Sequence, residues 1–223
     1  DLLRQLDIID TNALDKHLTI VGAGAIGSFT ALSICKMGYT GIIEVFDDDT
    51  VEAHNIPNQF YREIDATLHV QKVLALSEIC HEFTGRFIAG HAERIHTIPG
   101  HTHAAILAVD DMDTRIELYK SATNTLRWLL DARMGAEVMR IYTIDMQDAG
   151  NKKLYEENLY STAEAVQLPC TARATIYCAN VVAGLLTAQL ARVLMGKQHE
   201  SEMVMDLVNM QMLTRKVEER LTV

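Results

Sequence analysis

The turn V-G-A-G-A-I-G, residues 21–27, has the glycine spacing of a phosphate-binding loop. Gly22, Gly24 and Gly27 form the pattern G-x-G-x-x-G between an apolar run and a helical pattern. Glycines at these positions allow a tight turn and a close approach of the backbone to phosphate. The helix that follows offers free N–H groups and a partial positive charge at its N-terminus. The segment therefore predicts a nucleotide site, with a glycine turn inside a core as the alternative.

Acidic and amide side chains follow the next apolar run, in the stretch V-F-D-D-D-T-V-E-A-H-N, residues 45–55. Asp47 lies twenty residues after Gly27, where a carboxylate accepts hydrogen bonds from the hydroxyls of a ribose. An NAD-dependent oxidoreductase would account for the glycines and for Asp47. It would not need the polar residues that follow, which are Asp48, Asp49, Asn55, Gln59 and Lys72.

These additional residues suit a triphosphate better than a dinucleotide. The ammonium group of Lys72 can neutralise phosphate charge, and Asp110 follows another apolar run, A-A-I-L-A-V. A carboxylate there can hold Mg²⁺, which prefers carboxylate and phosphate oxygens. Arg115, five residues later, is interpreted either as a solvated helix charge or as a structural residue of this site. The residues favour ATP with Mg²⁺, and NAD-dependent hydride transfer remains an alternative.

Apolar runs and helical patterns alternate over the first part of the chain, as in doubly wound proteins. The runs that predict strands are 18–22, 41–46, 86–91, 104–109, 128–133, 138–144 and 203–208. The patterns that predict helices are 25–37, 68–84, 113–125 and 176–195, and the polar stretch 146–170 predicts loops. We therefore expect a Rossmann-like α/β fold with a mainly parallel sheet and additional C-terminal strands, and a site at the carboxyl ends of its strands.

Composition narrows the choice of partners. The formal net charge is −10, which argues against a nucleic-acid partner. The apolar run 176–195 has the length of a membrane span, but Asn180, Gln189 and Arg192 interrupt it. We expect this run to be a helix buried in a core or a dimer interface, with no membrane partner.

The four cysteines form no C-x-x-C pair, so neither a zinc ribbon nor a thioredoxin-like motif is expected. No signal peptide is visible, and the cysteine usage predicts a reducing, cytoplasmic compartment. Cys35, Cys80 and Cys178 lie in apolar helical patterns and are interpreted as small core residues.

In their order along the chain, these motifs resemble those of the ThiF/MoeB/HesA family and the ubiquitin-activating enzymes. The pattern of that family runs from R-Q through G-x-G-G-x-G and D-x-D-x-V-x-x-x-N-x-x-R-Q to a lysine and D-N-x-x-x-R. The corresponding segments here are Arg4-Gln5, G-A-G-A-I-G, D-D-D-T-V-E-A-H-N-I-P-N-Q, Lys72 and D-D-M-D-T-R. The resemblance covers nearly the whole chain.

The resemblance implies a single ThiF-type adenylation domain over 1–223. Residues 1–135 would form its nucleotide-binding half, and 136–223 a sheet extension, a crossover loop and an interface helix. Members of the family use MgATP to adenylylate a C-terminal carboxylate, usually the terminal glycine of a ubiquitin-like or sulfur-carrier protein. The same chemistry on a small molecule, a peptide or a tRNA is the first alternative, and a non-catalytic adaptor is another.

By the same resemblance Asp47 would bind ribose, Asp110 would bind Mg²⁺, and Arg4 would reach the triphosphate from the partner subunit of a homodimer. Catalysis would involve Arg4, Lys72, Asp110 and Cys170. The nucleotide would be bound by Gly22, Gly24, Gly27, Asp47, Asp49, Asn55, Gln59 and Lys72.

Two departures from the family pattern stand out. Asn58 occupies the position of the family arginine before Gln59, which removes a cation from the phosphates and is the best support for an adaptor. Arg133 or Arg62 is a hypothetical replacement. The paired cysteines that bind zinc in many bacterial members are absent, so no zinc is expected.

Cys170 lies in the segment L-P-C-T, at the end of the polar stretch. Ubiquitin-activating enzymes carry their thioester-forming cysteine in a similar context, which implies that Cys170 attacks the acyl-adenylate. Proximity to Arg173 or to a helix N-terminus would favour its thiolate. The alternative is a residue that packs at the start of the following helix, near the nucleotide.

Four histidines lie close together in sequence: His91, His96, His101 and His103. The segment H-T-H is a possible metal motif, but no fixed spacing to further ligands supports it. We interpret this segment as a surface loop that precedes a strand.

Overall fold

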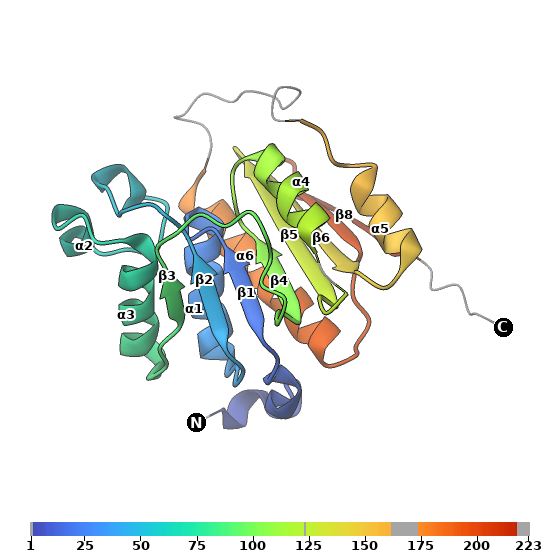
Figure 1. The fold of residues 1–223 in the computed structure, drawn as a ribbon, viewed down its shortest axis with the longest axis horizontal. Helices are drawn as coiled ribbons and strands as arrows, with labels where there is room; N and C mark the ends of the chain where they lie inside the picture. Colours follow the sequence, from blue (N-terminus) through green and yellow to red (C-terminus); the bar gives the residue numbers. More distant parts are fainter. Residues whose placement is uncertain (1, 123, 162–173, 218–223) are drawn as a thin grey trace.

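The computed structural model describes residues 2–122, 124–161 and 174–217, and within them the strands form one sheet (Figure 1). The order of its eight strands is β3-β2-β1-β4-β5-β6-β7-β8. The strands that pair in parallel are β1 (Leu18–Val21), β2 (Ile43–Phe46), β3 (Ala89–His91), β4 (Ala104–Leu107) and β5 (Trp128–Gly135). Antiparallel pairs add β6 (Val138–Asp145), β7 (Glu202–Asp206) and β8 (Gln211–Arg215).

The central strands β1 and β4 are short apolar runs, and every one of their residues is buried. Such runs are typical of parallel strands that are covered on both faces. Val21, the last residue of β1, lies opposite both Phe46 of β2 and Leu107 of β4. Because these three strands end level with one another, the loops that follow them begin at the same edge of the sheet.

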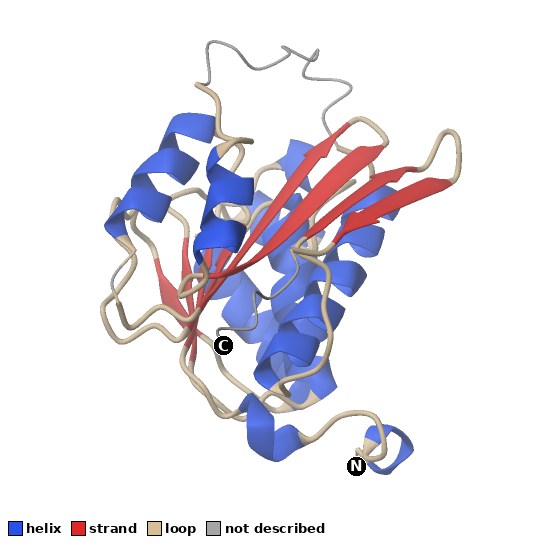
Figure 2. Cartoon of the chain, turned by 90° about the vertical axis from the view of Figure 1, so that its right-hand side faces the viewer, coloured by secondary structure: helices blue, strands red, loops and turns tan. Residues whose placement is uncertain are grey.

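Helices cover both faces of the sheet (Figure 2). On one face, α1 (Ala25–Met37), α3 (Lys72–Thr84) and α6 (Ile176–Leu194) contribute to a common apolar core with the strands. On the other face, α4 (Met112–Ser121) and α5 (Ala149–Glu156) pack in a second core. The shorter elements are α2 (Glu63–Thr67) and the 3₁₀ turns η1 (Leu3–Gln5), η2 (Thr11–Leu14) and η3 (Ala53–Asn55). Strands between two helical layers make this a doubly wound α/β fold, as predicted.

The helix α6 has the length and apolar composition of a membrane span. Of its most apolar stretch of 18 residues, 56% is buried inside the protein. Val182, Leu186 and Leu190 belong to the core that α1 and the strands also line. Gln189 is buried as well, and its Nε2 contacts Met203 while its Oε1 accepts a hydrogen bond from the backbone of Glu200. The prediction of a helix buried in the core is therefore confirmed.

Several boundaries differ from the sequence-based expectations. The helix predicted over 68–84 begins only at Lys72, because Val51 donates a backbone hydrogen bond to Val70 and Gln71 bridges to Thr50. The strand predicted over 86–91 covers only its last three residues. The polar stretch 146–170 was expected to be loop, yet it contains α5, which Asp148 caps. The strand β8 in the charged C-terminal stretch was not predicted.

Candidate active site

The glycine turn lies between β1 and α1, at the carboxyl edge of the sheet. Gly22 has a φ of +98°, and a Cβ at this position would lie 2.7 Å from the carbonyl oxygen of Ala108. At Gly27 a Cβ would lie only 1.9 Å from the carbonyl oxygen of Gly22. A Cβ on Gly24, in contrast, would meet no atom within 4 Å. Two of the glycines are thus needed by the turn itself, whereas the space beside Gly24 is open to a ligand.

Side chains from two later segments hold the peptide groups of this turn. The backbone N–H of Ala23 donates to Oδ2 of Asp47 at 2.6 Å, and its carbonyl accepts from the hydroxyl of Tyr61 at 2.5 Å. Asp47 comes directly after β2, as predicted, and its Oδ1 accepts from the N–H of Asp49. Burial raises the pKa of Asp47, and the hydrogen bond from Ala23 opposes that shift. Asp47 therefore anchors the glycine turn, and further lone pairs of its oxygens remain for a ribose.

Lys72 is the first residue of α3 and is only 6% exposed. Its Nζ donates to Oδ2 of Asp49 at 2.7 Å, and its backbone N–H donates to the carbonyl of the same residue at 2.9 Å. Asp49 itself is largely exposed. The structure thus joins Lys72, Asp49, Asp47 and the glycine turn into one connected network. Phosphate oxygens can compete with Asp49 for this ammonium group.

Amide side chains line the loop between β2 and α2. Asn55 is buried, and its Oδ1 accepts from the backbone N–H of Glu52 while its carbonyl accepts from the N–H groups of Asn58 and Gln59. Its Nδ2 makes no hydrogen bond within the described chain. Asn58 Oδ1 and Gln59 Oε1 are buried and have no hydrogen-bond partner among the described residues. An unpaired buried amide group costs about 1–3 kcal/mol, so these atoms call for a partner beyond the described residues, and a bound nucleotide is one candidate.

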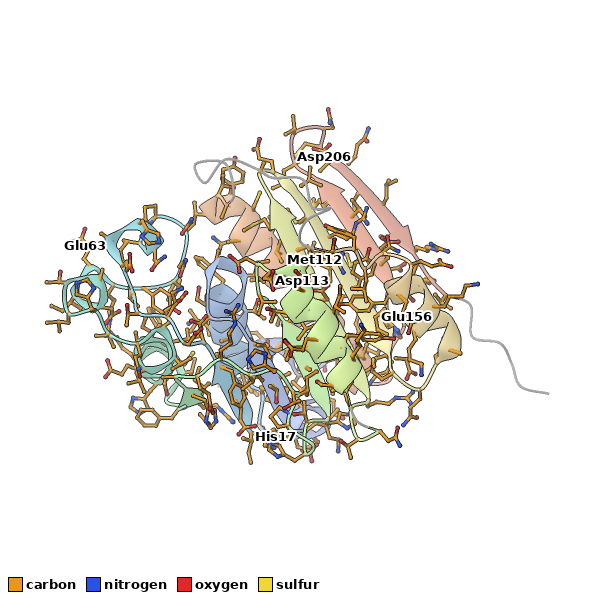
Figure 3. The ribbon with its side chains drawn as sticks, turned by 45° about the horizontal axis from the view of Figure 1, so that its top comes forward. His17, Glu63, Met112, Asp113, Glu156 and Asp206 are labelled. Atoms are coloured by element: carbon orange, nitrogen blue, oxygen red, sulfur yellow. The ribbon has the colours of Figure 1, made fainter. Side chains whose placement is uncertain are left out.

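Two adjacent carboxylates follow β4 and have different surroundings. Oδ2 of Asp111 accepts from both the N–H and the hydroxyl of Thr114, at 2.7 and 2.6 Å, and so caps α4. Asp110 is exposed and makes no hydrogen bond or ion pair with another described residue. Figure 3 shows the start of α4, marked by Met112 and Asp113, near the middle of the view onto this edge. Asp110 is therefore available to a cation or a ligand.

The surroundings fit a nucleotide with a divalent cation. Gly22 packs against Ala108, so the loop that carries Asp110 begins beside the glycine turn. A second acidic group comprises Asp47, Asp48 and Asp49, with one carboxylate oxygen of each within 4.8 Å of the others. Carboxylates of this kind, together with phosphate oxygens, form the ligand set that Mg²⁺ prefers.

Arg115 belongs to a buried ion-pair network and not to the solvated face of α4. Its Nε donates to Asp131 Oδ1 at 2.7 Å, while Arg133 Nε and the hydroxyl of Tyr155 donate to Asp131 Oδ2 at 2.8 and 3.0 Å. Burial acts to raise the pKa of Asp131, but the charges of the two arginines outweigh it and the pKa is lowered. The solvated interpretation of Arg115 is wrong, because the residue links α4 to β5.

The two arginines proposed to replace the cation lost at Asn58 are both bound to carboxylates. Arg133 contacts Asp131, although its Nη2 is buried without a hydrogen bond in the described chain. Arg62 donates to Asp65 at 2.8 Å and to Glu78 at 3.0 Å. Both guanidinium groups therefore already pair with carboxylates in this structure, and neither is free to bind phosphate.

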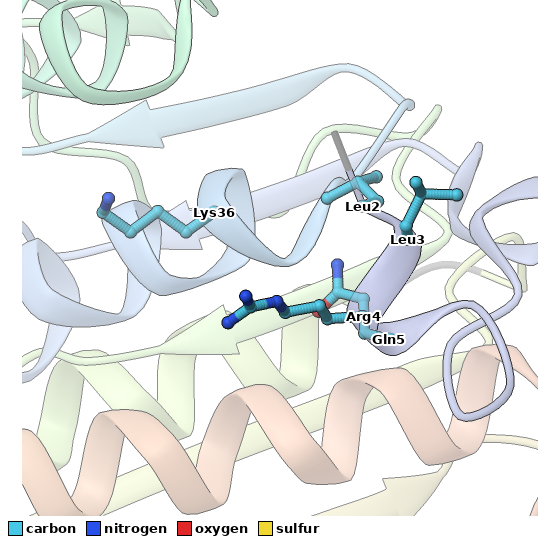
Figure 4. Close-up of a pocket in the computed structure, with 5 residues that line it drawn as sticks. All are labelled: Leu2, Leu3, Arg4, Gln5 and Lys36. Atoms are coloured by element: carbon cyan, nitrogen blue, oxygen red, sulfur yellow. The ribbon is translucent and has the colours of Figure 1, made fainter.

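Arg4 lies at the other end of α1 from the glycine turn. Gln5 donates from Nε2 to the carbonyl of Met37, the last residue of that helix, whose thirteen residues span roughly 20 Å. Together with Leu2, Leu3, Gln5 and Lys36, Arg4 lines a surface hollow of about 450 Å³ (Figure 4). The chain thus does not bring Arg4 to its own nucleotide site, and its action across subunits remains a prediction.

The cysteines divide into two groups. Cys35, Cys80 and Cys178 are buried, as expected for core residues. Cys170 falls in the segment 162–173, outside the described residues, so its thioester role remains a prediction.

The fold and the carboxyl-edge residues define a doubly wound α/β protein with a site suited to a nucleotide. The model of the ThiF family matches residues 4–222, and the chain belongs to this family. No match was found among proteins of curated function.

Solved structures with the same fold include PaaA, with a TM-score of 0.73 and 16% identity over 93% of this chain and 66% of that one. The fold of E. coli MccB, in a structure with ATP, gives a TM-score of 0.70 at 12% identity over 95% and 67% of the two chains. The microcin C7 biosynthetic enzyme MccB, in complex with N-formylated MccA, gives 0.69 at 12% identity over 95% and 68%. The chain thus spans about two thirds of the length of these proteins.

Proposed function

We propose that this chain is an ATP-dependent adenylyltransferase that activates the carboxylate of a protein or peptide. The observation that carries the proposal is the network at the carboxyl edge of the sheet. It joins the glycine turn to Asp47, Asp49 and buried Lys72, and Asp110 follows β4 without a partner among the described residues. An oxidoreductase would have no use for a lysine and a second carboxylate at these places.

The reaction transfers AMP to the acceptor. A carboxylate oxygen attacks the α-phosphorus of ATP, the bond from that phosphorus to the bridging oxygen breaks, and pyrophosphate leaves with the electron pair. Catalysis consists mainly of positioning and neutralisation of charge. The open space beside Gly24 and the N-terminus of α1 receive the phosphates, and Asp47 holds the ribose.

Lys72 and Asp110 act on the charge that develops on the leaving group. Lys72 exchanges its contact with Asp49 for phosphate oxygens, which form equally strong charge-assisted hydrogen bonds. Asp110, together with the carboxylates after β2, would hold Mg²⁺, which supplies positive charge next to the pyrophosphate oxygens. Arg4 from a second subunit would add a further cation, and Cys170 would accept the acyl group as a thioester.

Two acceptors are supported by different observations. The motif resemblance favours a ubiquitin-like or sulfur-carrier protein with a C-terminal glycine. The fold shared with MccB, which has been solved with MccA and AMPCPP, favours a peptide instead. The net charge of −10 disfavours a tRNA acceptor.

Calorimetric titration of the chain with ATP and with NAD, each with and without Mg²⁺, tests the nucleotide site. We expect Mg²⁺-dependent binding of ATP that is lost in Asp110→Ala and kept in Asp113→Ala, an exposed carboxylate in the first turn of α4. Preferential binding of NAD would overturn the proposal.

Exchange of labelled pyrophosphate into ATP then tests the chemistry. We expect exchange that depends on an added carboxylate, either a small glycine-tailed carrier protein or a short peptide, and comparison of the two identifies the acceptor class. ATP binding without exchange on any carboxylate would instead support a non-catalytic adaptor, for which Asn58 is the sequence signal.

A further inference from the structure

Three histidines surround the carboxylate of Glu44. Two of them, His17 and His101, lie at the end of the sheet opposite to the nucleotide site, whereas His91 is the last residue of β3. Glu44 lies on β2, His17 precedes β1, and His101 belongs to the crossover that leads into β4. The Nε2 atoms of His17 and His101 lie 2.9 and 2.8 Å from the same oxygen, Glu44 Oε2. Their ring centroids are 4.2 Å apart. Figure 3 shows His17 at the lower edge of the sheet, away from the start of α4.

The spacing of these donor atoms is close to that of metal ligands. The ligand atoms of His17, Glu44 and His101 all lie within 4.8 Å of one another. In a tetrahedral zinc site with bonds of about 2.0 Å, neighbouring ligand atoms are about 3.3 Å apart. The observed nitrogen–oxygen distances of 2.8 and 2.9 Å are slightly shorter, so the ligands need to part by only a few tenths of an ångström.

His91 stands beside the second oxygen of the same carboxylate. Its Nε2 is buried 3.2 Å from Glu44 Oε1, yet it makes no hydrogen bond with any described residue. Stacking on Phe46, with ring centroids 4.5 Å apart, holds the ring in this place. A buried ring nitrogen without a hydrogen bond is uncommon, and a small rotation of the carboxylate would give it one. Carboxylates that bind metals are usually held by such neighbours.

Charge and access also favour a cation. Burial acts to raise the pKa of Glu44, but hydrogen bonds from His101 and His17 outweigh it and the pKa is lowered, so the carboxylate is ionised at neutral pH. The carboxylate is only 14% exposed, whereas the side chain of His101 is 56% exposed. An ion can therefore reach the shielded carboxylate from the solvent on the side of His101.

We propose that His17, Glu44 and His101 form a binding site for one divalent transition-metal ion of the zinc class. Two imidazoles and a carboxylate are a donor set that zinc accepts, with water in a fourth position and His91 orienting Glu44. The ion would tie β2 to the start of β1 and to the crossover 92–103, which contains no helix. The sequence-based expectation that no zinc is bound rested on the absence of paired cysteines. The ligands proposed here are two histidines and a glutamate, so the site requires no cysteine.

The test is a calorimetric titration of the EDTA-treated full chain with ZnCl₂ in the absence of nucleotide. We expect one saturable site per chain, and at least a 100-fold loss of affinity in His101→Gln and His17→Gln. A smaller loss, about 10–100-fold, is expected in His91→Gln because that residue acts through Glu44. The matched control is His96→Gln, whose ring pairs with Glu117 outside the cluster and whose loss should leave binding unchanged. Titration with Co²⁺ should give the visible absorption of a four-coordinate ion in the wild type only.

Other results would overturn the proposal. The first is that the wild type shows no saturable zinc site. The second is that wild type, His101→Gln and His17→Gln bind zinc with equal affinity. Either result would mean that the cluster is only a hydrogen-bonded group. Binding that is lost in Asp48→Asn and kept in His101→Gln would place the ion at the three aspartates after β2 instead. Circular dichroism of each metal-free variant shows whether it is folded, and two independent histidine variants keep the test decisive if one is not.

Discussion

The carboxyl-edge site and the Asp131 network use similar residues in opposite ways. Asp131 is completely buried, and two arginines and a tyrosine donate to its oxygens. At the carboxyl edge, Lys72 is buried but its partner Asp49 is 66% exposed, and Asp110 has no partner among the described residues. In the first region the chain compensates its own charges, whereas in the second it leaves charges and polar atoms unpaired.

The difference separates charges that stabilise the fold from charges that serve a ligand. A buried charge without a counter-charge is costly, so a network such as that of Asp131 persists only when its charges compensate one another. The unpaired oxygens of Asn58 and Gln59 carry a cost that a bound molecule can remove. Substitutions in the two regions should therefore affect stability and activity separately.

The largest effect is expected from Asp131→Asn. The change leaves Arg115 and Arg133 without their common counter-charge in the interior, which should lower the free energy of unfolding by about 3–5 kcal/mol. The matched control is Asp15→Asn, which breaks an exposed pair with Lys16 and should cost at most about 1 kcal/mol. Urea unfolding measures both, and similar losses in the two variants would contradict the distinction between the regions.

The same network predicts the sign of an acid effect. The pKa of Asp131 is lowered in the folded state, so the unfolded chain takes up a proton at higher pH than the native one. The stability that this residue contributes is then fully present above its unfolded pKa of about 3.9 and is lost as the pH falls through the lower folded value. Asp131→Asn should lack this part of the acid dependence, and an unchanged pH profile of unfolding would contradict it.

In the carboxyl-edge site, Lys72→Met should reduce activity more than stability. The variant keeps the apolar stem but removes the charge on the phosphates, so pyrophosphate exchange should fall by a factor on the order of 10². Its partner Asp49 is largely exposed and stays solvated, so the unfolding midpoint should change little. Lys120→Met, on the last turn of α4, is the control that should change neither. A loss of stability with full exchange activity would show that Lys72 belongs with the structural charges.

Gly24→Ala should have a smaller effect on activity. Its φ of −75° is allowed for alanine and the added methyl group meets no described atom within 4 Å, so stability should change by less than about 1 kcal/mol. The methyl group would occupy the space proposed for phosphate, and the affinity for ATP should fall about tenfold, or about 1.4 kcal/mol. Gly184→Ala also enters open space, on α6, and should leave ATP affinity unaltered. Equal affinities in wild type and Gly24→Ala would move the phosphates away from this turn.

The sequence reveals the part of the site that local patterns encode. The apolar runs predicted the strands that end level at the carboxyl edge, and the glycine spacing predicted the turn between β1 and α1. Asp47 was placed at the end of β2 by its distance from Gly27, which follows from the length of one helix and one strand.

Contacts between distant segments left no local signal. Tyr61 holds the carbonyl of Ala23 across 38 positions, and His101 meets Glu44 across 57, so neither contact follows a helix or strand period. The histidines that are close in sequence were grouped, but their actual partners are elsewhere, as with His96 and Glu117. The role of Arg115 depended in the same way on Asp131, a residue of the following strand.

The smallest expected effect comes from Asp111→Ala. This variant tests, on the neighbouring residues Asp110 and Asp111, whether structural charges can be separated from charges that serve a ligand. The motif resemblance pointed to Asp110 and not to Asp111. In the structure Asp111 caps α4 through Thr114, while Asp110 makes no hydrogen bond or ion pair with another described residue. Loss of a cap costs about 1 kcal/mol of stability, and pyrophosphate exchange should remain within about twofold of wild type. Asp110→Ala should show the reverse, with a wild-type unfolding midpoint and no exchange. If both variants lose exchange equally, the two aspartates act as one cation site, and the separation of structural from functional charge fails at this position.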